Sequence, residues 1–407
     1  MYSTVLYCIF NKKTQLTFKK GEIGMDNLER TEKPIKIIKD TGNKQRKRTV
    51  DLKEFPNYEE EIQQFSKDLS CLTKKPLSSK MFRVIEPENV IEFWDKLLRD
   101  RSEGAEKVRT FFQKTFEAEL KLGKKMFARK LISARSPQCL SILSEEFPHF
   151  ERSGLINSLR EDLILSRLSG GVLSLTPTLM RSDAGFGKNR FVRHLGEVLG
   201  IPASRTFDFS STTAGWVISG LNSSWSGSKT GEVFQTLTSS KGVANPLFFI
   251  DELEKGSSSS NTSRPLDCLH SILEKESARN FQDEFCPIPV NTSQVLWLAA
   301  ANDLASISQS IISRFRVFEI PYPRPEEKRC IVKSIWCDLI SMNSWGKYLS
   351  PKLPEEIFEQ FEDESPRVIQ RILRSCAARA LARSEGKPPK EKMHCRLKIL
   401  FLKAKRM

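Results

Sequence analysis

The sequence predicts an α/β fold in which helices cover both faces of a parallel sheet and a small helical lid follows. Between residues 147 and 320, short apolar runs alternate with helical patterns, and several runs are almost wholly apolar. Such runs are typical of strands that are buried on both faces. A glycine-containing turn joins one of these strands to a helix at residues 177–191. From residue 325 onward the pattern is helical only.

The individual elements follow from where the apolar patterns begin and end. The expected strands are residues 178–181, 206–209, 247–250, 295–300 and 317–320. The expected helices of the sheet domain are residues 189–199, 233–239 and 266–275, and those of the lid are residues 326–339, 354–361 and 367–384. Residues 88–132 also show apolar positions at helical steps, which predicts core packing or a helix pair that docks a partner. The chain therefore divides into a poorly structured charged leader (1–85), a helical N-terminal region (86–135), the α/β domain (136–324), the lid (325–385) and a basic tail (386–407).

Charge and cysteine content limit the class of protein. A chain of 407 residues has material for two or three domains. The net charge is +15, and residues 383–407 hold nine Lys or Arg against two Glu. Such a tail either contacts nucleic acid or another anionic surface, or is a solvated end. The nine cysteines lack paired metal-ligand spacing, so we expect free thiols in a reducing compartment. Because the apolar opening of the chain is too short to span a bilayer, we expect a cytoplasmic protein without a membrane segment.

The turn between the first strand and the next helix has the layout of a phosphate-binding loop. Backbone N–H groups and the positive end of a helix face an anion in such loops. The usual pattern is G-x-x-x-x-G-K-[ST], but Ser182 stands at the first glycine and Asn189 at the Mg²⁺-binding hydroxyl position. A plain strand-turn-helix is the alternative. The predicted phosphate-binding residues are Asp183, Ala184, Gly185, Phe186, Gly187, Lys188, Asn189 and Arg190.

Polar side chains close two of the other apolar strands. Asp251 and Glu252 follow residues 247–250, and Asn302 follows residues 295–300. Ligands of parallel sheets bind beyond the carboxyl ends of the strands. Asp251 is thus a candidate to hold Mg²⁺ together with Asn189, Glu252 to polarise an attacking water, and Asn302 to orient that water or the terminal phosphate. The alternative is a set of ordinary polar turn residues.

Two arginines are candidates to stabilise charge on a transferring phosphate. Arg314 could project from one subunit into the nucleotide of the next, with Arg316 as a competitor for this role. Arg367 follows Pro366 at the start of a lid helix and could reach over the phosphates. A surface cation in a local ion pair is the alternative for each.

In this order, Gly187-Lys188, Asp251-Glu252, Asn302, Arg314 and Arg367 resemble the motifs of the AAA+ ATPases, which have the P-loop NTPase fold, and most closely the ATPase module of the Lon protease. The resemblance extends over residues 147–384. It implies that Lys188 is the Walker A lysine, Asp251 and Glu252 the Walker B pair, Asn302 sensor 1, Arg314 the arginine finger and Arg367 sensor 2. A peptidase domain is not expected, because only about 23 residues follow the lid.

The same resemblance places residues 224–227 where Lon-type motors carry an aromatic-glycine pore loop. Trp225 and Gly227 are its candidate residues, since an aromatic ring on a mobile loop can grip a polypeptide without sequence preference. The alternative is that Trp225 packs locally against Trp216.

Three functions are open from the sequence. The first is an oligomeric ring ATPase that binds ATP with Mg²⁺, hydrolyses it to ADP and phosphate and remodels a protein substrate, with no protease activity of its own. The second is a nucleotide-binding adaptor or scaffold with weak or no hydrolysis, because Ser182 and Asn189 depart from the usual pattern. The third is a nucleic-acid-directed AAA+ protein, suggested by the positive charge alone.

Overall fold

The computed structural model describes residues 77–383, without 121, 123, 124, 203, 204, 211–214, 258–265 and 363, and also Met393. The expected leader up to residue 76 and the basic tail apart from Met393 lie outside the described residues.

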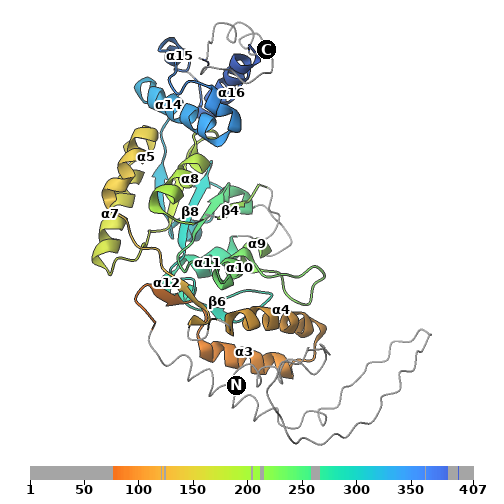
Figure 1. Ribbon diagram of the computed structural model, residues 1–407. Coiled ribbons are helices and arrows are strands. Elements are labelled where there is room, and N and C mark those ends of the chain that lie inside the picture. Colours follow the sequence, from red (N-terminus) through yellow and green to blue (C-terminus); the bar gives the residue numbers. More distant parts are fainter. Residues whose placement is uncertain are drawn as a thin grey trace, which may run out of the picture. The chain divides into compact units, whose positions relative to one another are not determined.

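A five-stranded parallel sheet forms the centre of the fold, with strand order β4-β5-β8-β3-β9 (Figure 1). Its strands are β3 (Thr178–Arg181), β4 (Arg205–Asp208), β5 (Leu247–Asp251), β8 (Leu296–Ala301) and β9 (Arg316–Glu319). Each lies within one residue of its expected bounds, which confirms the α/β prediction. Strand β3 lies between β8 and the edge strand β9. Its carboxyl end therefore meets the ends of its neighbours at one edge of the sheet.

Helices lie on both faces of this sheet. The helices of this domain are α5 (Ser141–Glu146), α6 (Pro148–Arg152), α7 (Leu155–Leu168), α8 (Lys188–Leu199), α9 (Trp216–Ser219), α10 (Glu232–Thr238), α11 (Asp267–Leu273), α12 (Lys275–Ala278) and α13 (Gln309–Ile312), with 3₁₀ turns η3 (Pro137–Leu140) and η4 (Leu253–Ser257). One hydrophobic cluster joins α5 to α8 with the sheet: Phe147, Phe150 and Phe191 pack there against Met180 and Phe249. The expected single helix over residues 266–275 is wrong, since Glu274 has an extended backbone that separates α11 from α12.

The lid is helical, as predicted. It contains α14 (Pro325–Met342), η5 (Ser344–Tyr348), α15 (Glu356–Glu359) and α16 (Pro366–Ala382). Trp336 and Phe361 are buried in a core of its own, separate from that of the sheet domain. Ser365 caps α16 by accepting a hydrogen bond from the Val368 N–H, and Pro366 occupies the first turn, where a missing N–H costs nothing.

Two helices and a small hairpin precede the sheet domain: α3 (Pro87–Arg99), α4 (Glu103–Leu120), β1 (Met81–Arg83) and β2 (Ala128–Lys130). Two expectations are corrected here. Residues 128–130 are a strand rather than helix, and residues 81–83 of the supposed leader form its antiparallel partner. Strands of three residues are too short to show a period, and their pairing depends on a partner far along the chain.

A buried ion pair fixes α4 to the sheet domain. The Arg129 guanidinium contacts both carboxylate oxygens of Glu119, at 2.7 and 3.2 Å, and each side chain is only 1% exposed. Arg129 also donates to the Thr238 carbonyl at the end of α10 (2.6 Å). Two charges that are this deeply buried are tolerated because each has several hydrogen-bond partners.

A second hairpin, β6 (Phe281–Gln282) and β7 (Pro289–Val290), encloses a buried carboxylate. Asp283 is completely buried and accepts hydrogen bonds from the N–H groups of Gly231 (2.7 Å), Phe285 (3.0 Å) and Cys286 (3.1 Å). Desolvation outweighs these three bonds and raises the pKa of Asp283 to about 7.

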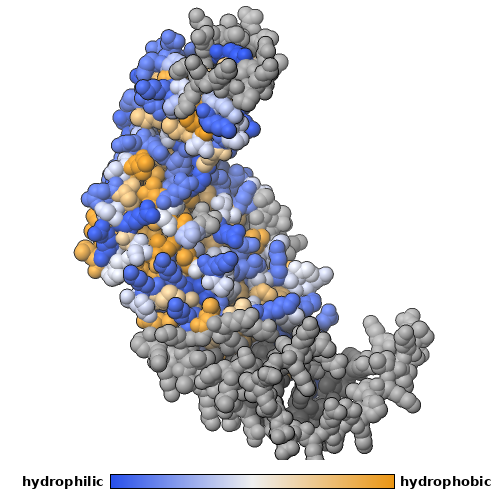
Figure 2. Space-filling model, viewed as in Figure 1, coloured by the Kyte–Doolittle hydropathy of each residue, from blue (hydrophilic) through white to orange (hydrophobic). Residues whose placement is uncertain are grey.

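The surface of the described residues carries an apolar area over α5 and α7, visible as orange atoms in Figure 2. The exposed apolar side chains there are Ile142, Ile164, Leu165 and Leu168. Among the described residues, no helix combines the length and hydrophobicity that crossing a bilayer requires.

Candidate functional site

The carboxyl edge of the sheet collects the polar residues that the sequence singled out. Lys188 begins α8 directly after the loop that follows β3, Asp251 ends β5, and Asn302 follows β8. The loop turns sharply because Gly185 and Gly187 both have φ near 90°, a conformation that glycine adopts without strain. The fold thus gathers three residues that are far apart in the chain.

Lys188 is buried, and its ammonium group is hydrogen-bonded on several sides. It donates to the Ser182 carbonyl (2.7 Å), the Ser182 hydroxyl (3.1 Å) and Asn302 Oδ1 (3.0 Å). Ser182, which replaces the usual glycine, therefore adds an acceptor for the lysine. Asp183 contributes its carbonyl oxygen at 3.4 Å.

Burial lowers the pKa of the Lys188 ammonium. Nearby carboxylates act in the opposite direction; these are Asp251, Glu254, Asp183 and Glu252. The site therefore combines a desolvated ammonium, several carboxylates and a loop whose turns need glycine. Such an arrangement suits an anionic group that is bound together with a cation.

Asn189 and Asp251 contact each other directly. Asn189 Nδ2 donates to Asp251 Oδ2 at 2.6 Å, which leaves the amide oxygen of Asn189 for another ligand. Carboxylate and amide oxygens are ligands that suit Mg²⁺. Glu252 comes next in the chain with φ at 53°, and its N–H donates to Asp251 Oδ1 at 3.0 Å. A non-glycine residue in this conformation is uncommon, and such residues cluster at functional sites.

The comparisons with known proteins agree with this geometry. Residues 179–322 match the family model "ATPase family associated with various cellular activities (AAA)". The mitochondrial Lon protease homolog of Yarrowia lipolytica is 28% identical over 220 residues, which is 54% of this chain and 17% of that protein. Lon protease 1 of Thermus thermophilus is 32% identical over 116 residues, covering 28% of this chain and 14% of its own length. The chain carries a Lon-like AAA+ ATPase domain.

Similarity to one solved structure supports the assignment of the fold and of nothing else. A closed-state cryo-EM reconstruction of Hsp104 with ATPyS and FITC casein superposes with a TM-score of 0.50 and 12% identity, over 64% of this chain and 49% of that one. The chain spans less than a quarter of the length of the curated Lon relatives it matches.

The lid of this AAA+ domain reaches the phosphate loop. A side chain at Gly185 would place its Cβ 3.3 Å from Arg367 Cβ, so the exposed Arg367 lies beside the loop. Arg190, expected to bind phosphate, instead contacts the lid: its Nε donates to Asp338 Oδ2 at 2.6 Å. His194 on α8 contacts the same carboxylate at 3.0 Å and Glu146 at 2.6 Å. These two carboxylates raise the pKa of His194 to about 9 against the opposing effect of burial.

Arg314 does not lie at the carboxyl edge of the sheet, because it precedes the first residue of β9. It follows α13 and pairs with Glu274 at 3.5 Å, with its side chain 28% exposed. Arg316 on β9 forms an ion pair with Asp162 on α7 at 3.6 Å. The predicted role of Arg314 at a neighbouring subunit's site stays a prediction.

Trp225 lies on a loop, residues 221–229, that we call the Trp225 loop. The Leu221 N–H donates to the Lys229 carbonyl at 3.0 Å and closes it. The Trp225 ring is 63% exposed, whereas the Trp216 ring lies under the Lys229 ammonium at 5.2 Å. The exposure of Trp225 does not fit the alternative in which it packs against Trp216. On the side of the loop facing α4, a Cβ at Gly104 would come within 2.7 Å of Ser223 Oγ.

Two residues near the site carried no recognisable sequence signal. His149 is buried, and its Nε2 lies 3.1 Å from the Phe186 carbonyl of the phosphate loop. Burial lowers the pKa of His149 to about 4, so the neutral ring donates this bond. Glu254, on η4, accepts from Asn302 Nδ2 at 2.8 Å. Neither residue stands at a motif position, and only the folded chain brings them there.

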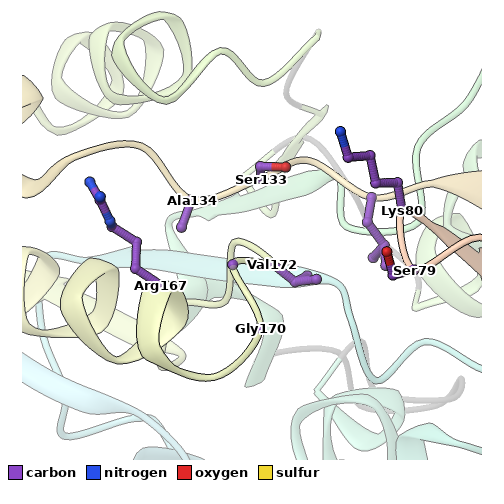
Figure 3. A pocket seen from close by; sticks show the side chains of 9 residues that line it. Ser79, Lys80, Ser133, Ala134, Arg167, Gly170 and Val172 are labelled. Carbon is purple, nitrogen blue, oxygen red and sulfur yellow. The ribbon is translucent and has the colours of Figure 1, made fainter.

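A separate cleft of about 410 Å³ lies at the end of α7 (Figure 3). Lys80 and Arg167 flank it, and Ser133 and Gly170 contribute to its lining. None of the predicted site residues lines it.

Proposed function

We propose that this chain is an ATPase that binds ATP with Mg²⁺ and hydrolyses it to ADP and phosphate. The observation that supports this is the convergence of Lys188, Asp251 and Asn302 at one edge of an AAA+ sheet. The hydrogen-bond donors at this edge suit the phosphates of a nucleotide. They are an ammonium group, the backbone of a glycine turn at the start of a helix, and an arginine on the lid.

Each residue has a role in this proposal. Lys188 binds the terminal phosphates, and Asp251 with the free oxygen of Asn189 holds Mg²⁺, which supplies charge neutralisation. The attacking water forms the new P–O bond as the bond to ADP breaks, and Glu252 accepts its proton. Arg367 stabilises the phosphate charge from the lid.

We further propose a ring in which Arg314 acts on the nucleotide of the next subunit and Trp225 contacts a polypeptide substrate. The partly exposed position of Arg314, away from Lys188 and Asp251, and the exposure of Trp225 support this. The exposed apolar side chains of α5 and α7 support self-association, since such areas mark contact surfaces.

The decisive experiment is calorimetric titration with ATP and Mg²⁺, together with phosphate release by the wild type, Glu252→Gln and Asn189→Thr. We expect binding by all three and phosphate release that Glu252→Gln abolishes. Binding without phosphate release in the wild type, restored by Asn189→Thr, would instead identify a nucleotide-binding scaffold. In that case the Asn189 amide, which bonds to Asp251, would be the cause. Absence of binding would refute both functions.

Assembly is tested separately by light scattering with ATP and Mg²⁺. We expect light scattering to show oligomers in the wild type, and we expect phosphate release to be lost in Arg314→Ala. Arg279→Ala, at an exposed arginine that pairs locally with Glu276, is the matched control and should behave as wild type.

A further inference from the structure

A buried carboxylate that the mechanism above does not use lies behind Asn302. Glu254 is 8% exposed and comes one turn after Asp251, on η4. Its Oε1 accepts a hydrogen bond from Asn302 Nδ2 (2.8 Å), and Asn302 Oδ1 accepts one from the Lys188 ammonium (3.0 Å). A carboxylate, an amide and an ammonium thus form one continuous chain.

The chemistry of this chain sets the orientation of the amide. An ionised carboxylate only accepts hydrogen bonds, so Asn302 must turn its NH₂ toward Glu254 and its oxygen toward Lys188. The reversed amide would place two acceptors together at one end and two donors together at the other. The two bonds to ionised groups are of the stronger kind, and burial increases the cost of losing them.

The same orientation fixes Lys188. An ammonium has three protons, and its three shortest contacts are the two oxygens of Ser182 and Asn302 Oδ1. A bound phosphate could take the place of a Ser182 oxygen as acceptor while Asn302 keeps the lysine at the sheet edge. Without a correctly turned amide, Lys188 loses its acceptor on the β8 side.

We infer that Glu254 is a positioning residue that acts through Asn302 to hold the Lys188 ammonium where nucleotide phosphates bind. The inference rests on the proposed nucleotide binding, though not on hydrolysis. It distinguishes Glu254 from Asp251 and Glu252, whose roles involve the metal and the water.

A double-mutant cycle on the affinity for ATP with Mg²⁺ tests this. Glu254→Met removes the acceptor at similar length, and Asn302→Ala removes the amide. We expect each to weaken binding about tenfold, as for loss of one charge-assisted hydrogen bond. The double variant should bind ATP about tenfold, rather than about a hundredfold, more weakly than the wild type, because both changes interrupt the same chain of hydrogen bonds. Glu254→Gln should retain near wild-type affinity for ATP, because the amide oxygen of Gln can still accept the hydrogen bond from Asn302. Glu319→Leu, at an exposed carboxylate of β9, is the control.

A reversed pair keeps the test informative if Glu254→Met does not fold. Asn302→Asp alone puts a carboxylate against Glu254 and should weaken binding. Adding Glu254→Gln supplies a donor to that carboxylate and should recover the affinity. Wild-type affinity in Glu254→Met, additive losses in the cycle, or no recovery in the reversed pair would overturn the inference. A wild type that binds but does not hydrolyse ATP would refute hydrolysis alone, and one that does not bind would refute the proposed function itself.

Discussion

The phosphate loop and the Trp225 loop are held in opposite ways. At the phosphate loop, the central side chain is buried, and Lys188 bonds to residues of the loop and of the neighbouring strand. At the Trp225 loop, the central side chain is exposed, and the support comes from beneath. The residues that flank this loop contact Asp283: the Gly231 N–H donates to its carboxylate, and a Cβ at Gly220 would lie 2.5 Å from it.

This difference separates the residues that do chemistry from those that hold a surface in place. A change at the first loop should alter ligand binding and leave the fold intact. A change beneath the second should alter stability and leave nucleotide binding intact.

Lys188→Ala should give the largest effect. We expect ATP affinity to fall at least about a hundredfold, because the charge that faces the phosphates is lost. Calorimetric titration measures the change. Lys241→Ala, at an exposed lysine outside the site, should bind as wild type. Similar affinity in the two variants would remove Lys188 from the site.

In Asp283→Asn, the amide NH₂ would point at a buried backbone N–H that donates to the carboxylate in the wild type. Because two donors would then face each other, we expect the free energy of unfolding to fall by about 2 kcal/mol. Urea denaturation measures this. ATP affinity should stay unchanged, since Asp283 is not at the nucleotide edge. A loss of affinity with unchanged stability would contradict the division between the two loops.

The pH dependence of the same variant sharpens the test. The pKa of Asp283 in the folded protein, about 7, is higher than in an unfolded chain. The folded protein therefore binds the extra proton, and this contribution to stability is lost as pH rises through 7. The wild type should lose stability progressively as pH rises from about 4, the usual pKa of an unfolded Asp, to about 7, and this slope should be smaller in Asp283→Asn.

His194→Gln should have a smaller effect, about 1 kcal/mol, at the contact between α8 and the lid. The groups that face His194 are the carboxylates of Asp338 and Glu146, with Arg190 and Arg193 nearby. The raised pKa means that its stabilising charge is fully present below about pH 6.5 and is lost as pH rises through about 9. Thermal melting should thus separate the wild type from the variant at pH 6 and not at pH 10.

Trp225→Ala should have the smallest effect on the folded protein, under about 0.5 kcal/mol, because an exposed side chain buries little surface. Denaturation and ATP titration should both match the wild type. A loss above about 1 kcal/mol would show that the ring packs into the structure rather than facing outward.

The convergence of Lys188, Asp251 and Asn302 at one edge of the sheet was predictable, because Asp251 and Asn302 mark the ends of apolar strands. A buried strand such as Leu247–Asp251 is recognised in the sequence by its run of apolar residues. The carboxylate that ends the strand must therefore lie at the edge of the sheet. The glycines around Lys188 add a local signal of the same kind.

The supporting residues were not predictable, because their partners are distant. Glu254 looks like one more acid after Asp251-Glu252, and only the position of β8 makes it a partner of Asn302. Asp283 looks like a polar turn residue, and its contacts with Gly220 and Gly231 appear only in the folded chain. The two-residue strands around it are too short to show a period.

The pair between Arg129 and Glu119 decides where this protein can be cut. A shortened version that begins at residue 121 would keep the guanidinium against α10 and discard its counter-ion, leaving an unbalanced cation inside the protein. Isolated positive charge in such a place destabilises by several kcal/mol. A version of the AAA+ domain trimmed for crystallisation should therefore retain α4 together with β2.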